Sequence, residues 1–219
     1  MEIRKPNPAF EVHEYGQELR QILGENLPSH SFLLQYRPNK NWFYYEYEGI
    51  HGMRHITRVL ILQELLASLT ERARSMLLNR EALRFAAITH DLRRQSDLAD
   101  ESHGQRAGIW IKEHLQDLCD SKTLEMTAEL NTRHNDGIKL PFEEFPELAL
   151  FKDADALDRC RFGERSYTKL NERALRTEES KTLIIPAKAI YLLSEAKVRE
   201  GVDHFEAPLD AAAELGLIS

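Results

Sequence analysis

The sequence predicts an all-α protein, a single-domain helical bundle with an irregular aromatic arm near its N-terminus. Apolar residues recur at helical spacing through most of the chain beyond residue 50, and residues that start and stop helices separate these runs at short intervals. No segment shows the alternation of strands and helices that is typical of a parallel sheet. The 219 residues suffice for one sizeable hydrophobic core but are few for two, which predicts one domain.

The segment before residue 50 is the least regular part of the chain. Residues 11–23 predict a polar helix that ends at Gly24. Pro28 and Pro38 then interrupt the pattern, and an aromatic cluster occupies residues 42–47. We expect an extended or irregular arm that packs on the core, or a short hairpin, since aromatic residues favour strands.

Helical periodicity becomes regular from His51 onward. One long helix is expected over about residues 52–70. A second begins after Asn79, a good N-cap residue, and leads into His90 and Asp91. Because this second helix is apolar nearly all round, it should lie near the centre of the bundle. Further helices are expected from Ser102, over residues 121–134, from Pro146 after a loop at 135–145, over residues 186–200 and over residues 209–215.

The composition narrows the classes of function. No apolar run is long enough to span a bilayer, and the first 14 residues lack the apolar stretch of a secretory signal, which predicts a cytoplasmic protein without a membrane partner. Cys119 and Cys160 are expected to be reduced thiols. The net charge of −7 disfavours nucleic acid as a partner. A local group of arginines beside the segments rich in histidine and aspartate suits a small anionic substrate: Arg54, Arg58, Arg93, Arg94, Arg106, Arg133, Arg159 and Arg161.

Histidines and aspartates stand at or near the ends of several predicted helices. Imidazole nitrogen and carboxylate oxygen are the usual ligands of zinc, manganese and iron. A helical bundle can aim such side chains from different helices at one point. The pair His90-Asp91 carries the most weight, because an aspartate at the end of an apolar helix is costly to bury without a partner. The segments concerned are residues 51–59, 89–94, 100–104, 133–135 and 152–158.

The order of these residues resembles the H…HD…D signature of the HD superfamily of metal-dependent phosphohydrolases. His55 stands for the first histidine, His90-Asp91 for the pair and Asp155 for the last aspartate. The flanking residues are similar to family motifs as well: His-Ile-x-Arg-Val at residues 55–59, His-Gly at residues 103–104 and Lys-Asp-Ala-Asp-x-Leu-Asp at residues 152–158.

The resemblance implies a division of the chain. It covers about residues 50–165, which would form a helical core of the HD-domain type. Residues 1–49 would supply the N-terminal helix and irregular arm, and residues 166–219 would supply helices that complete the same domain.

The resemblance also implies a ligand set and a cofactor. Four residues would bind one metal ion: His55, His90, Asp91 and Asp155. His103 and His134 resemble the additional histidines of dinuclear members. They would hold a second ion, with Asp91 as a bridge, or contact the substrate phosphate beside a single ion. The implied cofactor is one or two divalent transition-metal ions, which would be Mn, Fe, Ni or Zn.

Other histidines and aspartates of these segments are expected to play lesser parts. His51 comes four residues before His55 and can share its helix face, so it is expected near the site without binding the ion. Asp153 and Asp158 are expected to lie behind the ligands or to face solvent. The remaining histidines are expected on the surface: His13, His30, His114 and His204.

The implied reaction is hydrolysis of a phosphate ester or phosphoanhydride by a water that the metal activates. Arg93, Arg94 and Arg106 flank the ligands and are candidates to stabilise charge on the phosphoryl group. Asp97 or Asp100 could act as a general base or orient the water, or be a solvated loop carboxylate. The expected catalytic residues are therefore Asp91, Arg93, Arg94 and Asp100, and the expected substrate-binding residues are Arg94, Arg106, His103 and His134.

The expected partner is a small phosphorylated molecule, with nucleotides as the first class to consider. Arg94 and Gln95 stand where hydrolases of the stringent-response alarmone place an acidic pair, which disfavours that substrate. The Gly-Tyr-Pro element of cyclic-di-nucleotide phosphodiesterases and the helicase motifs of CRISPR-associated nucleases are absent. The sequence allows a homodimer, a common assembly, without requiring it.

Three alternatives remain open. The same six ligands would suit a mixed-valent di-iron oxygenase, of which myo-inositol oxygenase is an example in the superfamily. A regulatory or binding protein could keep the metal for structure alone. A nuclease acting on single strands could use the aromatic residues 42–47 to stack bases, although the net charge disfavours it.

Overall fold

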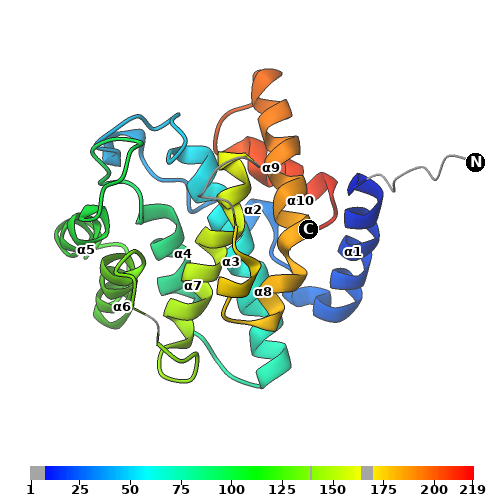
Figure 1. Ribbon diagram of the computed structural model, residues 1–219, viewed down its shortest axis with the longest axis horizontal. Coiled ribbons are helices and arrows are strands. Elements are labelled where there is room, and N and C mark those ends of the chain that lie inside the picture. The colour runs from blue at the N-terminus through cyan, green and yellow to red at the C-terminus, as the bar shows by residue number, and fades with distance from the viewer. Residues whose placement is uncertain (1–7, 139, 164–169) are drawn as a thin grey trace, which may run out of the picture.

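The computed structural model describes residues 8–138, 140–163 and 170–219 (Figure 1). The described residues form ten α-helices, connected by loops and short 3₁₀ turns, and contain no β-strand, so the predicted all-α class is confirmed. The helices are α1 (Pro8–Leu23), α2 (His30–Leu34), α3 (Met53–Arg74), α4 (Arg80–Thr89), α5 (His103–His114), α6 (Ser121–Arg133), α7 (Pro146–Leu157), α8 (Glu178–Thr182), α9 (Ile184–Arg199) and α10 (Glu206–Glu214).

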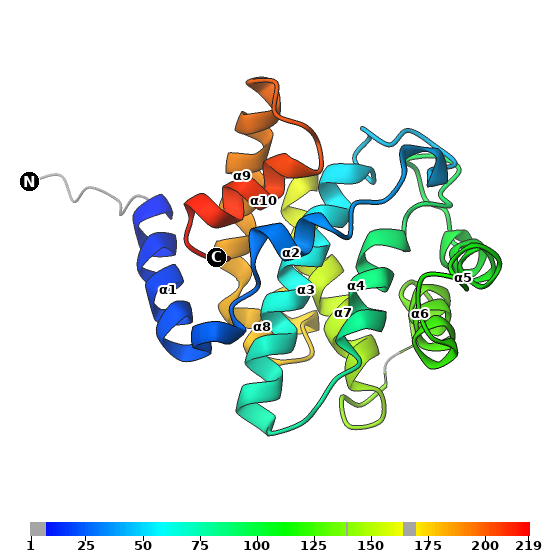
Figure 2. The ribbon, with the colours of Figure 1, turned by 180° about the vertical axis from the view of Figure 1, so that it is seen from behind.

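Helix α3 runs through the middle of the bundle. It packs against α4 and α7 on one side and against α9 and α10 on the other (Figures 1 and 2). Helices on several sides explain why α3 is buried nearly all round, including the polar residues Gln63 and Glu64. The helix begins directly after Gly52, where a Cβ atom would lie 2.2 Å from the carbonyl oxygen of Tyr47, so only glycine fits this turn.

Helices α5 and α6 form a tightly packed pair at one end of the molecule (Figure 2). Two glycines on α5 allow the close approach. A Cβ atom on Gly104 would lie 2.5 Å from the carbonyl oxygen of Asn131, and one on Gly108 would lie 2.2 Å from Oγ1 of Thr132. The packing brings the start of α5, with His103, beside the end of α6, with His134.

The N-terminal arm is irregular, as predicted, but it is not a hairpin. Its described part contains the short helix α2 and a 3₁₀ turn over Lys40–Trp42, and residues 26–49 include no strand. The indole of Trp42 packs on that of Trp110, with ring centroids 5.3 Å apart, whereas Tyr44 is 60% exposed. The hairpin expectation was wrong because the aromatic side chains are stabilised by contact with α5 and the loop before it instead of by strand pairing.

Most helix boundaries agree with the sequence. Asn79 caps α4 by accepting a hydrogen bond from the backbone of Ala82 at 3.0 Å, and Pro146 stands in the first turn of α7. Helix α3 continues four residues beyond the expected end at Thr70, and α9 starts at Ile184, two residues before Pro186. The short helices α2 and α8 were not predicted, because a single turn shows no periodicity.

One hydrophobic core unites the described chain. The cluster extends from Leu19 in α1 to Ile218 and takes residues from every long helix. His13 and His114 are exposed, as expected, but His30 and His204 are half-buried, and His30 Nε2 lies 2.9 Å from a carboxylate oxygen of Asp210. Within the described residues, no helix combines the length and the apolar character needed to cross a bilayer.

Candidate metal centre

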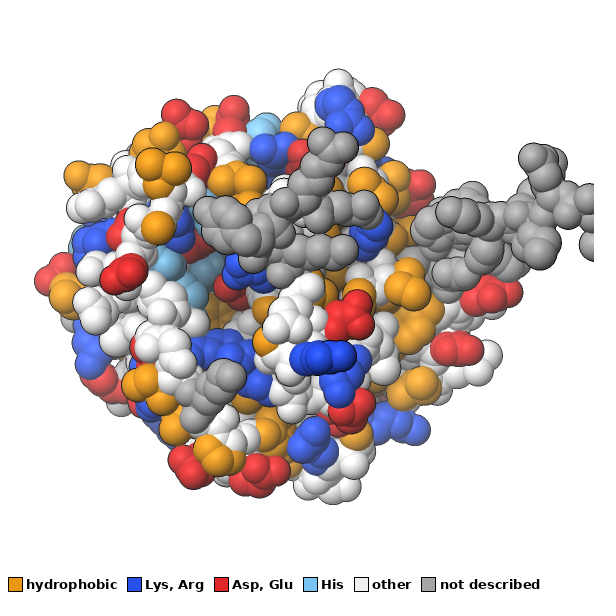
Figure 3. All heavy atoms as spheres, viewed as in Figure 1, with side chains coloured by type: hydrophobic (Ala, Val, Ile, Leu, Met, Phe, Trp, Pro, Cys, Tyr) orange, Lys and Arg blue, Asp and Glu red, His pale blue; other side chains and the backbone are white. Residues whose placement is uncertain are grey.

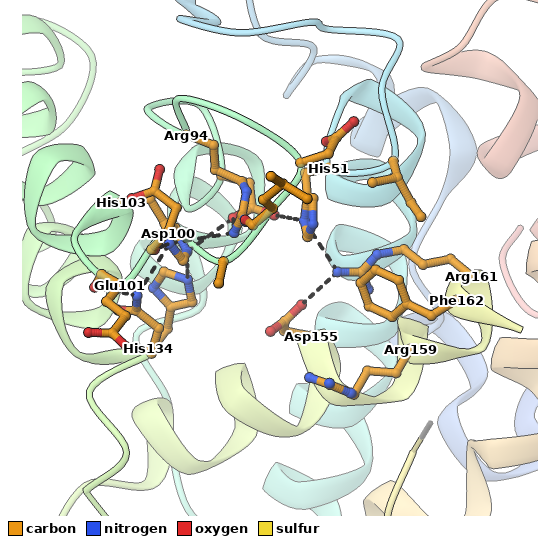
Figure 4. A pocket seen from close by; sticks show the side chains of 16 residues that line it. His51, Arg94, Asp100, Glu101, His103, His134, Asp155, Arg159, Arg161 and Phe162 are labelled. Atoms are coloured by element: carbon orange, nitrogen blue, oxygen red, sulfur yellow. Dashed lines mark hydrogen bonds and ion pairs between the residues drawn. The ribbon is translucent and has the colours of Figure 1, made fainter. Parts of the chain in front are cut away.

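A pocket of about 700 Å³ opens where the ends of several helices meet. In the space-filling view of Figure 3, histidine side chains are visible inside a hollow on this face. The close view in Figure 4 shows His103 and His134 on one side of the pocket and His51, Asp155 and Arg161 on the other. All six residues expected as ligands meet at this pocket or directly beneath it.

His55 and His90 form the buried floor of the centre. His55 Nε2 lies 3.0 Å from His90 Nε2 and 3.3 Å from Oδ1 of Asp155. The ligand atoms of His55, His90 and Asp155 all lie within 4.8 Å of one another, so this group could hold a metal ion. His55 and His90 come from α3 and the end of α4, and Asp155 comes from α7, so three distant segments of the chain supply the group.

A second group lies beside the first and is linked to it by Asp91. Nε2 of His103 is 3.2 Å from Oδ1 of Asp91 and 2.8 Å from Nε2 of His134. These three residues also place their ligand atoms within 4.8 Å of one another. The other oxygen of Asp91, Oδ2, is 3.4 Å from Nε2 of His55. The carboxylate of Asp91 therefore stands between the two groups with one oxygen toward each.

The four histidines of the two groups share one orientation. Each directs Nε2 toward the centre and places Nδ1 against an oxygen atom. For His90 and His134 these oxygens are the backbone carbonyls of Ala87, at 2.9 Å, and Asn131, at 2.6 Å. Nδ1 of His103 contacts the carbonyl of Asp100, and Nδ1 of His55 lies 2.8 Å from the carboxylate of Asp158. An oxygen acceptor holds a proton on Nδ1, so Nε2 is the nitrogen that faces the centre and that becomes a metal ligand once it carries no proton.

Asp158 supports His55 from behind. Its carboxylate is fully buried and also accepts hydrogen bonds from Nε and Nη2 of Arg58, at 2.6 and 3.1 Å. Arg58 is held in turn by Glu195 of α9, at 3.3 Å. Asp158 thus lies behind a ligand, one of the two placements expected, whereas Asp153 points away from the centre and binds the backbone nitrogens of Arg176 and Thr177.

Burial and the close charges shift the pKa values of these groups in opposite directions. Burial lowers the pKa of His90 to about 3 and that of His134 to about 4, so both rings are neutral at pH 7. Burial also opposes the charged form of His55, but hydrogen bonds to Asp155, Asp158 and Asp91 outweigh it and raise the pKa to about 9. Burial disfavours ionised Asp91 too, yet the surrounding imidazoles keep its pKa well below the usual range. The acidic groups are therefore ionised and ready to bind a cation.

The arginines expected to face a substrate do not all reach the pocket. Arg94 lines it, with Nη1 3.5 Å from Oδ1 of Asp91. Arg93 and Arg106 instead line a separate pocket on the other side of the loop, where Arg93 stacks over Tyr44. Both residues follow the end of α4, where Arg93 donates a hydrogen bond to the backbone carbonyl of Trp42 and Arg94 donates one to that of Leu98, so the two side chains diverge.

Asp100 borders the pocket, but its carboxylate is already engaged. It pairs with Nη2 of Arg106 at 2.5 Å and accepts a hydrogen bond from the backbone of Gln95 at 2.9 Å. These bonds fix the loop between α4 and α5 and, through the backbone carbonyl of Asp100, the ring of His103. Asp97 also borders the pocket and is exposed.

Two neighbours of the centre lie closer to the ligands than the sequence indicates. His51 is near the site, as expected, and its Nδ1 is 2.8 Å from Oδ2 of Asp91. Its orientation is the reverse of the four other histidines, although its ligand atom groups with those of His55 and Asp91 within 4.8 Å. Arg161, in the 3₁₀ turn Asp158–Phe162 after α7, also reaches the pocket. The sequence offers one indication for each of them, its position a few residues from a candidate ligand, and many other residues share that feature.

No family model, no curated protein and no solved structure matches this chain. The fold and the site thus define an all-helical protein with buried histidine and aspartate groups that could hold a metal ion. Only the geometry of these groups bears on a more specific function.

Proposed function

We propose that this protein is a metal-dependent phosphohydrolase of the HD type that acts on a small phosphorylated molecule. The single observation that carries the proposal is the common orientation of His55, His90, His103 and His134. The four rings, three of them buried and that of His134 half-buried, turn Nε2 toward two carboxylates and place Nδ1 against other oxygen atoms. Such an arrangement directs four ligand nitrogens and two carboxylates to one place, as a metal centre requires.

The residues that meet are those that the HD resemblance selects. His55, His90, Asp91 and Asp155 are separated by up to 100 residues along the chain, yet their ligand atoms lie within 3.0 to 3.9 Å in the contacts made. A chance arrangement of surface histidines would not place the signature residues together. This coincidence supports the HD type independently of the spacing in the sequence.

The grouping supports two ions rather than one. Asp91 turns Oδ2 to the first group and Oδ1 to the second, and His103 and His134 complete the second group without using a ligand of the first. A bridging carboxylate between two ions is a common design for hydrolysis of phosphate esters. We therefore assign His103 and His134 to a second ion.

The proposed chemistry follows from these residues. When bound, such ions supply an activated water and polarise a phosphoryl oxygen. The chain fixes the ligands through the Nδ1 hydrogen bonds and brings the guanidinium of Arg94 to the pocket wall, where it favours a negatively charged ligand. A volume of about 700 Å³ is in the range that a nucleotide-sized ligand requires.

The test is product analysis after incubation with Mn²⁺ and a panel of nucleotides, cyclic nucleotides and sugar phosphates. We expect turnover of one group of compounds, and its loss in Asp91→Ala. Asp117→Ala is the matched control, because Asp117 is an exposed aspartate that does not line the pocket. Unchanged turnover in Asp91→Ala would refute the proposal.

The di-iron oxygenase is the other activity that six such ligands support. Absence of turnover across the panel, together with two irons per chain and a mixed-valence paramagnetic signal, would favour it. Two ions without any turnover or redox signal would favour a regulatory protein.

A further inference from the structure

Arg161 occupies an unusual place at the edge of the centre. Its side chain is only 5% exposed, and Nη2 lies 3.5 Å from Nδ1 of His51 and 4.0 Å from Oδ1 of Asp155 (Figure 4). The guanidinium packs on the ring of Phe162, with 4.2 Å between its central carbon and the ring centroid. The packing fixes the plane of the guanidinium at the wall of the pocket.

The hydrogen bonds of Arg161 are incomplete. Nη1 donates to the backbone carbonyl of Asp158 at 3.1 Å and lies 3.7 Å from its carboxylate, but Nε is buried and has no hydrogen-bond partner among the described residues. Arg58, in contrast, donates two bonds to the carboxylate of Asp158, the shorter of them 2.6 Å. A buried guanidinium with unused donors is costly, and the cost is relieved when an acceptor arrives.

A metal ion changes the balance around Arg161. The same oxygen of Asp155 that faces Arg161 belongs to the first ligand group. If Asp155 held an ion together with His55 and His90, this oxygen would face two positive charges, and its attraction for the guanidinium would be weaker. A metal ion and a buried guanidinium side by side then favour an anion that contacts both.

We propose that Arg161 binds the phosphate of the substrate. The ligand class is a tetrahedral oxyanion, with one oxygen toward the ions and another toward the guanidinium. This inference rests on the proposed function for its substrate class. Arg161 thus takes the phosphate-binding role that the sequence suggested for Arg93 and Arg106, which line a different pocket.

The experiment measures binding of inorganic phosphate to the Mn²⁺-loaded protein by calorimetry, so it does not depend on turnover. The variants are Arg161→Met and Arg161→Lys, and Arg93→Met is the matched control because it removes a neighbouring arginine that lines the other pocket. Metal content is measured for every variant by mass spectrometry. We expect phosphate affinity to fall roughly tenfold or more in Arg161→Met, with unchanged metal content and with Arg93→Met like the original protein.

Arg161→Lys keeps the positive charge but loses the planar guanidinium that can donate two parallel hydrogen bonds. This variant tests the assignment if Arg161→Met fails to fold. We expect it to bind phosphate several-fold more weakly than the original protein. Phosphate affinity that is unchanged in these variants, or no phosphate binding by the original loaded protein, would overturn the assignment. Loss of phosphate binding in Arg161→Met together with no turnover of any phosphorylated substrate would support the anion site and refute the phosphohydrolase, so the two proposals fail separately.

Discussion

The carboxylate of Asp158 lies 2.8 Å from Nδ1 of His55 and at the same time binds Arg58 through two hydrogen bonds. Burial disfavours its charge, but Arg58 and His55 hold the pKa of Asp158 at about 2. The aspartate is therefore ionised at neutral pH, and it holds the ring of His55 with Nδ1 toward it.

Asp158→Asn should weaken metal binding although Asp158 contacts no ion. The asparagine side chain lacks the negative charge with which Asp158 orients His55 and makes its ring more basic. Loss of such a hydrogen bond to a metal-ligating histidine lowers metal affinity roughly 10- to 100-fold. Competition with a chelator measures the effect. Asp153→Asn is the matched control, because Asp153 is an equally buried aspartate of α7 that binds Arg176 and Thr177. Equal metal affinity in the two variants would contradict the role of Asp158.

Gly104→Ala should disturb the second ligand group, whereas Gly108→Ala should only destabilise the fold. Both glycines face α6, but a Cβ atom on Gly104 would lie 3.0 Å from Cε1 of His134, and one on Gly108 would meet Thr132 and Ala128. We expect Gly104→Ala to bind about one ion fewer per chain than the original protein. Thermal unfolding and metal stoichiometry, measured on both variants, separate the two effects. Two ions in folded Gly104→Ala would show that the second group is wrongly assigned.

Metal binding should release protons at neutral pH. The pKa of His55 is about 9 before an ion arrives, so the ring carries an extra proton at pH 7 that must leave when Nε2 becomes a ligand. The apparent affinity for the metal should therefore fall as the pH is lowered below about 9. His55 alone should release about one proton for each ion that binds. Calorimetry in two buffers of different ionisation enthalpy counts the protons. A proton count of zero at pH 7 would mean that His55 is already neutral in the free protein.

Added metal should raise the melting temperature of the original protein more than that of His90→Ala, which keeps only the second ligand group intact. An ion that binds only the folded chain stabilises it by about 2.7 kcal/mol at a concentration 100-fold above the dissociation constant. His90→Ala removes a ligand from the first group. His114→Ala removes an exposed histidine that stacks on Trp110, and it should keep the metal-induced shift. A shift of equal size in His90→Ala would place the ion elsewhere.

The all-α class and most long helices could be predicted from the sequence because their cues are local. Asn79, Pro146 and Gly201 mark boundaries, and the structure has helix ends within a few residues of each. The four residues of the HD signature could also be predicted from the sequence, since both the family pattern and their positions near helix ends indicate them. Their meeting in space could be expected, but the sequence alone does not establish it, because it depends on how the helices cross.

The directions of the arginine side chains could not be predicted from the sequence. Arg93 and Arg94 are adjacent in the chain, and nothing in the sequence tells which of them faces the ligands. Direction at a frayed helix end depends on the last turn, on the loop that follows and on partners such as the carbonyl of Leu98, which binds Arg94 at 2.6 Å. Arg161 is in a 3₁₀ turn, where the helical period of about 100° per residue no longer applies.

The hydrogen bond from Arg58 to Glu195 has a consequence for the limits of the functional unit. A fragment of residues 50–165 would include every candidate ligand, yet it would lack Glu195 and Ser194, which hold Arg58, and the backbone that binds Asp153. It would also expose core side chains that Leu183, Ile190 and Leu209 cover. The segment that carries the motif therefore depends on the C-terminal helices for its structure. Substitutions in the motif-poor C-terminal helices should be as damaging as those beside the ligands, and homologues that replace these helices would need another anchor for the same arginine.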